Sequence, residues 1–217
     1  MAQWLNTAFA DFDLAIFNFM HYLQVNAGGF FTTFFKVITF LGEKGWLYIV
    51  AGVILLLFKK TRKIGFTILI SILIGTIVTN LVIKNIVSRP RPFTASDFYY
   101  DCWNLVGPTN VGKNSFPSGH TTGATAATVA WILSSNKKYR FTGIAFAILM
   151  GLSRIYLFVH YPTDVIAGFI VGTVSAIGGY YAVKGIFSLL EKHNTNKVAN
   201  FILTASLDEV LIKKLNK

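Results

Sequence analysis

Between two long apolar runs lies the segment Arg154-Ile-Tyr-Leu-Phe-Val-His160-Tyr-Pro-Thr-Asp164. Its ionisable residues, Arg154, His160 and Asp164, are costly near a bilayer, and such residues are usually functional there. His160 and Asp164 are four residues apart, so one helical turn would place a carboxylate against an imidazole and orient it as a nucleophile or base. Arg154 adds a planar cation that suits a phosphate. The segment therefore predicts a reactive site at a junction between membrane helices.

The composition is typical of a membrane protein with several spans. Of 217 residues, 53% are hydrophobic and 13% are charged, and the mean hydropathy is +0.55. Soluble domains carry roughly 25% charged residues. The net charge of +11 is clustered between apolar runs, so membrane topology explains it and no nucleic-acid partner is expected. Because Cys102 is the only cysteine, the chain forms no intrachain disulfide.

The apolar runs predict an all-α fold, a polytopic membrane helix bundle of about six transmembrane helices in one membrane-embedded domain, 1–217. A long polar loop, 85–119, interrupts the runs, and a tail, 191–217, follows them with a loose amphipathic pattern that suggests a surface-lying helix. The pattern includes Phe201, Ile202, Ala205, Leu207, Val210, Leu211 and Leu215. The expected spans are 12–41 with a break at 26–29, 46–58, 64–83, 120–133, 141–153 and 165–183.

Basic residues predict the orientation of the bundle. Loops 59–63 and 137–140 carry seven Lys or Arg between them, and the tail is also basic. With six spans all three lie on one side, which the positive-inside rule makes cytoplasmic. Loop 85–119 and the junction near His160 then fall together on the extracytoplasmic face. Topology alone therefore brings the unusual polar residues to one surface.

Two further segments contribute polar groups to that face. The first is Lys84-Asn-Ile-Val-Ser-Arg-Pro-Arg91-Pro92. A basic helix end with snorkelling side chains would explain it, but that explanation predicts a cytoplasmic position. The second is Pro117-Ser118-Gly119-His120, an ordinary helix start. Free amides, a hydroxyl and a glycine at a helix N-terminus also form an anion site, beside which His120 would stand.

A metal site is the main rival chemistry. His120, His160 and Asp164 would form a set of two histidines and one carboxylate. However, Lys84, Arg91 and Arg154 would surround a metal with like charge, whereas the same cations would neutralise a phosphate. We therefore expect no metal and no cofactor.

The three segments together resemble the signature motifs of the type 2 phosphatidic acid phosphatase superfamily. The matching residues are Lys84 with Arg91-Pro92, then Pro117-Ser118-Gly119-His120, then Ser153-Arg154 with His160 and Asp164, complete and in the family's order and spacing. The short, span-rich chain is similar to the bacterial membrane branch, which contains phosphatidylglycerophosphatase B and undecaprenyl diphosphate phosphatases.

The resemblance implies a mechanism and a class of substrate. It makes His160 the nucleophile, Asp164 the group that orients it and His120 the general acid. It assigns phosphate binding to Lys84, Arg91, Ser118, Gly119 and Arg154.

The implied substrate is a membrane lipid phosphate, phosphatidylglycerophosphate in the first instance, with undecaprenyl diphosphate as the alternative. A transporter of anions or phosphorylated solutes would also place cations at broken helix ends. The chain has no internal repeat, and runs 64–83 and 165–183 are uncharged, which favours an enzyme.

Overall fold

The computed structural model describes residues 1–136 and 138–208. Within these residues the chain is helical, apart from connecting loops and one isolated β-bridge between Pro90 and Asn114. The elements in chain order are α1 (Ala2–Ala8), α2 (Ala10–Leu41), η1 (Glu43–Gly45), α3 (Trp46–Leu56), α4 (Arg62–Ile77), η2 (Val78–Ile83), α5 (Lys84–Val87), η3 (Pro92–Thr94), α6 (Asp97–Leu105), α7 (Gly119–Ser134), η4 (Lys138–Phe141), α8 (Thr142–Tyr156), α9 (Pro162–Lys192) and α10 (Lys197–Thr204).

The helices form a membrane bundle, as the apolar runs predict. Each of the six predicted runs is helical. Among the described residues, two helices are long and apolar enough to cross a membrane alone, Arg62–Val87 and α9. The first of these combines α4, η2 and α5, and its π-helical turn directly precedes Lys84. Helices α2 and α3 make a third candidate if the pair, bent by 41°, is one span. The all-α membrane fold is therefore confirmed.

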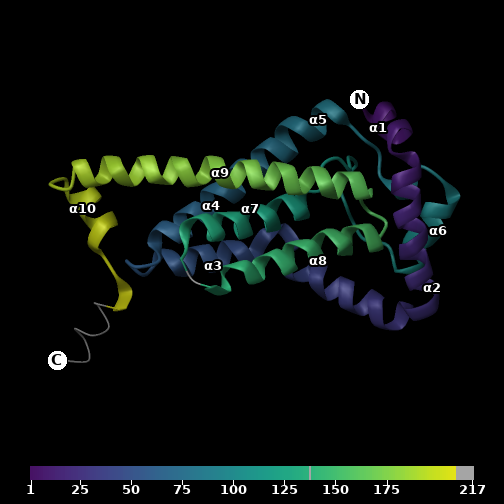
Figure 1. The fold of residues 1–217 in the computed structure, drawn as a ribbon, viewed down its shortest axis with the longest axis horizontal. Helices are drawn as coiled ribbons and strands as arrows, with labels where there is room; N and C mark the ends of the chain where they lie inside the picture. The colour runs from purple at the N-terminus through teal and green to yellow at the C-terminus, as the bar shows by residue number, and fades with distance from the viewer. Residues whose placement is uncertain (137, 209–217) are drawn as a thin grey trace.

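Helix α7 lies at the centre and packs against α4, α8 and α9 (Figure 1). Two glycines of α9 allow α7 to approach closely. A Cβ atom on Gly172 would lie 2.6 Å from the Thr122 carbonyl oxygen, and one on Gly168 would lie 2.9 Å from that of Ser118. The amide of Ser118 donates to the Asp164 carbonyl at 3.0 Å, so the starts of α7 and α9 are fixed side by side.

The N-terminal half of α2 covers one end of the bundle together with α6 (Figure 1). Helix α2 bends at Ala27, where φ is −146° and ψ is 26°, so the break predicted at 26–29 is present. In the half of α2 that precedes the bend, Phe17 stacks on Phe158 with ring centroids 4.6 Å apart. The ring centroids of Phe17 and Tyr99 of α6 are 4.8 Å apart. Helix α6 lies within the predicted polar loop, which is therefore partly helical.

The basic loops lie at the opposite end of the bundle, near α10 (Figure 1). Arg62 donates to the Ile202 carbonyl at 2.6 Å and also to that of Ala205. Lys63 pairs with Glu191 at 3.1 Å. The predicted amphipathic tail is helical over α10. Its positions Val210, Leu211 and Leu215, like Lys137 of the second basic loop, lie outside the described residues.

Candidate active site

One cavity of about 470 Å³ joins the three polar segments of the sequence. A Cβ atom on Gly119 would lie 3.8 Å from Lys84 Nζ, so the first turn of α7 faces the end of the long membrane helix. The cavity also extends along α4 as far as Ile72. The sequence-predicted residues that line it are Lys84, Arg91, Gly119, His120, Arg154 and His160.

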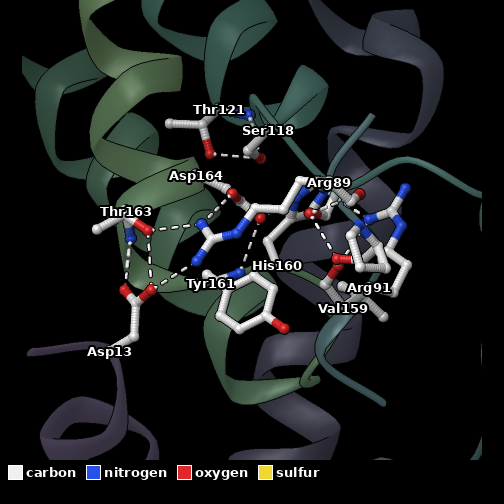
Figure 2. A network of polar contacts seen from close by, with 12 residues as sticks. Asp13, Arg89, Arg91, Ser118, Thr121, Val159, His160, Tyr161, Thr163 and Asp164 are labelled. Atoms are coloured by element: carbon white, nitrogen blue, oxygen red, sulfur yellow. Dashed lines mark hydrogen bonds and ion pairs between the residues drawn. The ribbon is translucent and has the colours of Figure 1, made fainter. Parts of the chain in front are cut away.

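His160 lies in the connection between α8 and α9 and is 2% exposed. Its Nε2 atom is 2.9 Å from Nη1 of Arg91 (Figure 2). Because a guanidinium only donates, Nε2 must accept, and the ring proton of the neutral tautomer sits on Nδ1. Nδ1 lies 3.5 Å from Asp164 Oδ2. The lone pair of Nε2 therefore points toward the cationic side of the cavity.

The charge state of His160 follows from its surroundings. Burial lowers its pKa well below the ordinary value of 6.5, and the positive charges of Arg91, Arg154 and Lys84 lower it further. The imidazole is thus neutral at neutral pH, and the lone pair of Nε2 accepts from Arg91.

Arg91 connects His160 to the polar loop. Its Nε donates to the Gly112 carbonyl at 2.8 Å, and Nη1 donates to that of Val159 at 2.6 Å. Burial lowers the pKa of Arg91 to about 10, so it keeps its positive charge at neutral pH. The cation is therefore held rigidly beside Nε2 of His160.

Asp164 is fully buried and lies behind His160, outside the cavity lining. Its Oδ2 accepts from the Tyr161 amide at 2.9 Å, and its Oδ1 accepts from Nη1 of Arg89 at 2.7 Å. Asp164 therefore lies beside the histidine and outside the cavity lining, and its predicted orienting role stays a prediction. The sequence interpretation assigned no role to Arg89, although it lies two residues before Arg91.

Arg154 is held in the last turn of α8, where it is 2% exposed and lines the cavity. Its Nη1 lies 3.5 Å from Thr39 Oγ1 on α2. Its buried Nε has no hydrogen-bond partner among the described residues. A substrate oxygen in the cavity would satisfy that donor.

His120 lies in the first turn of α7, on the cavity wall. Its Nε2 is 3.6 Å from Oε2 of Glu43, which comes from the turn between α2 and α3 and also lines the cavity. The sequence interpretation treated Glu43 only as part of a turn. No local pattern links it to His120, because the two are distant in sequence.

Ser118 does not line the cavity. It is the N-cap of α7, and its Oγ accepts from the Thr121 amide at 3.4 Å and from the Thr121 hydroxyl at 2.9 Å. Its predicted contact with phosphate stays a prediction, whereas Gly119 and His120 next to it do face the cavity.

The metal alternative concerns His120, His160 and Asp164. Across 1–136 and 138–208, no group of three or more His, Cys, Asp or Glu is arranged to hold a metal ion. Both carboxylate oxygens of Asp164 already accept hydrogen bonds from the protein, as described above.

Comparison with known proteins identifies the family. The model of the PAP2 superfamily matches residues 64–187, which include all three signature segments. The chain belongs to the PAP2 superfamily. Its relatives in this family are phosphatases, so the expectation of a phosphatase is confirmed at this level.

Individual PAP2 relatives are similar over most of their length. An undecaprenyl-diphosphatase of Sulfolobus acidocaldarius is 34% identical over 169 residues, which cover 75% of this chain and 74% of the relative. Phosphatidylglycerophosphatase B of Bacillus subtilis is 32% identical over 163 residues, covering 68% and 71%.

A solved PAP2 structure has the same fold. The crystal structure of a transmembrane PAP2-type phosphatidylglycerolphosphate phosphatase from Bacillus subtilis matches with a TM-score of 0.63 and 25% identity. The match covers 85% of this chain and 89% of the other. The relatives named here differ in substrate, so they do not define one for this PAP2 protein.

Proposed function

We propose that this protein is an integral-membrane lipid phosphate phosphatase that works through a phosphohistidine on His160, without a metal ion. One observation supports this most directly. The unprotonated Nε2 of His160 lies 2.9 Å from Arg91 in a cavity that Lys84, Arg154 and His120 also line. A phosphoryl group bound among these cations would present its phosphorus atom to Nε2.

In the first step, the Arg91 donor shifts from Nε2 of His160 to a phosphate oxygen, and Nε2 attacks phosphorus while the bond to the lipid oxygen breaks. Asp164 stabilises the positive charge that develops on the ring. His120 enters this step as an imidazolium, a form that Glu43 and the bound phosphate stabilise, and gives its proton to the leaving oxygen. Lys84, Arg91, Arg154 and the Gly119 amide bind the equatorial oxygens, where the transition state gathers charge.

In the second step, water attacks the phosphorus atom and the Nε2–P bond breaks. His120, now without its proton, accepts one from the water as general base. The released phosphate leaves both histidines in their starting states. The cations that a metal would otherwise supply are side chains in this scheme.

The shape of the cavity supports a lipid substrate. From Lys84 the lining runs along the membrane helix to Ile72, about 18 Å away at 1.5 Å per residue. Thr76 of α4 and Asn80 of η2 line the cavity and are exposed. A headgroup bound at His160 would therefore leave room for its chains beside α4, within the bilayer.

Phosphatidylglycerophosphate is the first candidate substrate, with phosphatidylglycerol as the product. Undecaprenyl diphosphate is the second, favoured by the undecaprenyl-diphosphatase of Sulfolobus acidocaldarius at 34% identity. The relatives described above are phosphatases by name, which favours catalysis over transport of an anion or phosphorylated solute.

A substrate panel tests the proposal. Phosphate release is measured with purified protein on phosphatidylglycerophosphate, phosphatidic acid, undecaprenyl diphosphate, a short isoprenoid diphosphate and p-nitrophenyl phosphate. We expect faster turnover of a lipid than of the soluble ester, and all of it should depend on His160. No phosphate release from any compound would contradict the proposal.

A matched pair of variants tests the position of the lipid chains. Thr76→Trp fills the cavity beside α4, whereas Ile77→Trp adds the same side chain at a neighbouring exposed position outside the lining. Thr76→Trp should slow lipid turnover while p-nitrophenyl phosphate turnover persists, and Ile77→Trp should do neither. Equal effects of both variants on lipid turnover would contradict this placement.

We further propose that the active site faces the extracytoplasmic side and that loops 59–63 and 137–140 and the tail are cytoplasmic. Loop 59–63 and η4 lie at the end of the bundle opposite α5 and the start of α7, which carry residues that line the cavity, and this separation supports the orientation (Figure 1). Single cysteines at the exposed positions Lys113 and Lys60, in a Cys102→Ser background, test it in intact cells. An impermeant maleimide should label Lys113→Cys only, and labelling of Lys60→Cys alone would reverse the orientation.

A further inference from the structure

Asp13 lies behind the active site although it belongs to the N-terminal helix. It is 3% exposed, in the first turn of α2. Its Oδ1 accepts from the Thr163 amide at 3.0 Å, and its Oδ2 accepts from the Thr163 hydroxyl at 2.9 Å and from Nη2 of Arg89 at 2.9 Å. Thr163 immediately precedes Asp164, so Asp13 holds the start of α9 where the orienting carboxylate sits.

Arg89 connects the two carboxylates. Figure 2 shows its guanidinium between Asp164 and Asp13, from helices far apart in the chain. Arg89 is 0% exposed. Its Nη1 donates to Thr163 Oγ1 and to Asp164 Oδ1, each at 2.7 Å. Its Cζ atom lies 3.7 Å from the Tyr161 ring centroid. The fork geometry and stacking suit an arginine at a fixed position.

Charge explains why a second carboxylate is needed. Arg89 neutralises Asp164, so these two alone would offer His160 little net negative charge. Asp13 pairs with the other side of Arg89, so that with both carboxylates ionised the buried group of three carries one net negative charge. His160 needs that charge, because attack on phosphorus makes its ring positive while Arg91 stands on the other side.

We propose that Asp13 is a positioning residue of the phosphatase site, which acts through Arg89 on Asp164. The proposal rests on the phosphohistidine mechanism proposed above. It assigns a function to a residue outside 64–187, the part of the chain that the PAP2 family model matches. The N-terminal half of α2 is then part of the catalytic machinery and not only a cover over it.

The test compares Asp13→Asn with Asp11→Asn. Both remove one carboxylate from the first turn of α2 in a nearly isosteric way, but Asp11 is exposed. Asp13→Asn should lower kcat by about 10- to 100-fold, as is typical of residues that orient a reactive group from behind. KM should change little, because Asp13 does not line the cavity. Asp11→Asn should retain the wild-type kcat.

A double variant separates charge balance from simple support of the fold. In Asp13→Asn/Arg89→Gln the buried guanidinium is also removed, so Asp164 again faces His160 with its full charge. The double variant should be faster than Asp13→Asn alone, whereas two independent structural losses would make it slower. If Asp13→Asn does not fold, the double variant is compared directly with wild type, and a rate within about tenfold is expected.

Several results would overturn the inference. One is equal kcat for folded Asp13→Asn and Asp11→Asn, and another is a double variant no faster than Asp13→Asn. If only the double variant folds, a rate more than about tenfold below that of wild type would have the same meaning. Wild-type protein without His160-dependent phosphate release would instead contradict the proposed function. If the wild-type protein is active and the kcat of Asp13→Asn equals that of wild type, only the proposed role of Asp13 would be contradicted, and the proposed function would stand.

Discussion

Nη1 of Arg91 lies 2.9 Å from Nε2 of His160 and 2.6 Å from the Val159 carbonyl oxygen. A single guanidinium nitrogen thus fixes both the ring and the backbone of the reactive segment. The contact also determines the tautomer, because a guanidinium can only donate and Nε2 must therefore accept. When a phosphoryl group enters, the same donor is in place to bind its oxygen.

Arg91→Lys should therefore lower activity strongly, although the substitution keeps the positive charge. A lysine keeps the charge but cannot reach the Gly112 and Val159 carbonyls and the phosphate together. We expect kcat/KM to fall by about 10²-fold or more, as for loss of one transition-state donor. Steady-state phosphate release measures it, and a wild-type value would show that Arg91 is not needed as a donor.

His120→Ala should show a defect that depends on the leaving group. The proposed acid protonates the lipid oxygen, which is a poor leaving group, but p-nitrophenolate leaves without a proton. The loss of kcat should be largest for the lipid and smallest for p-nitrophenyl phosphate. An identical loss for both substrates would refute the acid role and leave His120 as a binding residue.

The low pKa of His160 predicts how this residue behaves in a pH titration. Burial and neighbouring cations hold its pKa well below 6.5, so the ring stays neutral as the pH falls through the range in which free imidazole protonates. In the unfolded chain the ring takes up that proton first, so this group lowers stability as the pH falls below 6.5. Histidine ¹⁵N resonances, with His160→Asn used for assignment, should show no titration of His160 between pH 7.5 and 6. A midpoint near 6.5 would contradict the cationic surroundings.

Removal of metal ions by a chelator tests whether side-chain cations neutralise the phosphate without a metal ion. If Lys84, Arg91 and Arg154 neutralise the phosphate, activity should be unchanged in excess EDTA. Loss of activity that zinc restores would favour the metal alternative built on His120, His160 and Asp164.

The sequence predicted the helical membrane fold and most of the cavity because these depend on local patterns. Apolar runs predict membrane-spanning helices. Because Lys84, His120 and His160 each stand at the end of such a run, topology alone places them at one end of the bundle. Ser118 was less predictable, since a serine before a helix can cap it or bind an anion, and here its Oγ accepts from Thr121.

The supporting residues could not be read from the sequence. Asp13 meets Arg89 across 76 positions, and no spacing rule connects an acidic residue at the start of one helix with an arginine in a later loop. Glu43 reaches His120 only because the turn after α2 folds over the start of α7. Such contacts depend on how helices pack, which the apolar pattern leaves open.

Covalent catalysis by Nε2 of His160 requires a phosphohistidine intermediate, which can be trapped. Wild-type protein is mixed with a ³²P-labelled lipid phosphate and quenched within one turnover. We expect a protein-bound label that is stable to base and labile to acid, as a phosphohistidine is. The label should be absent from His160→Ala, together with nearly all turnover. Near-native turnover by purified His160→Ala would contradict covalent catalysis by His160.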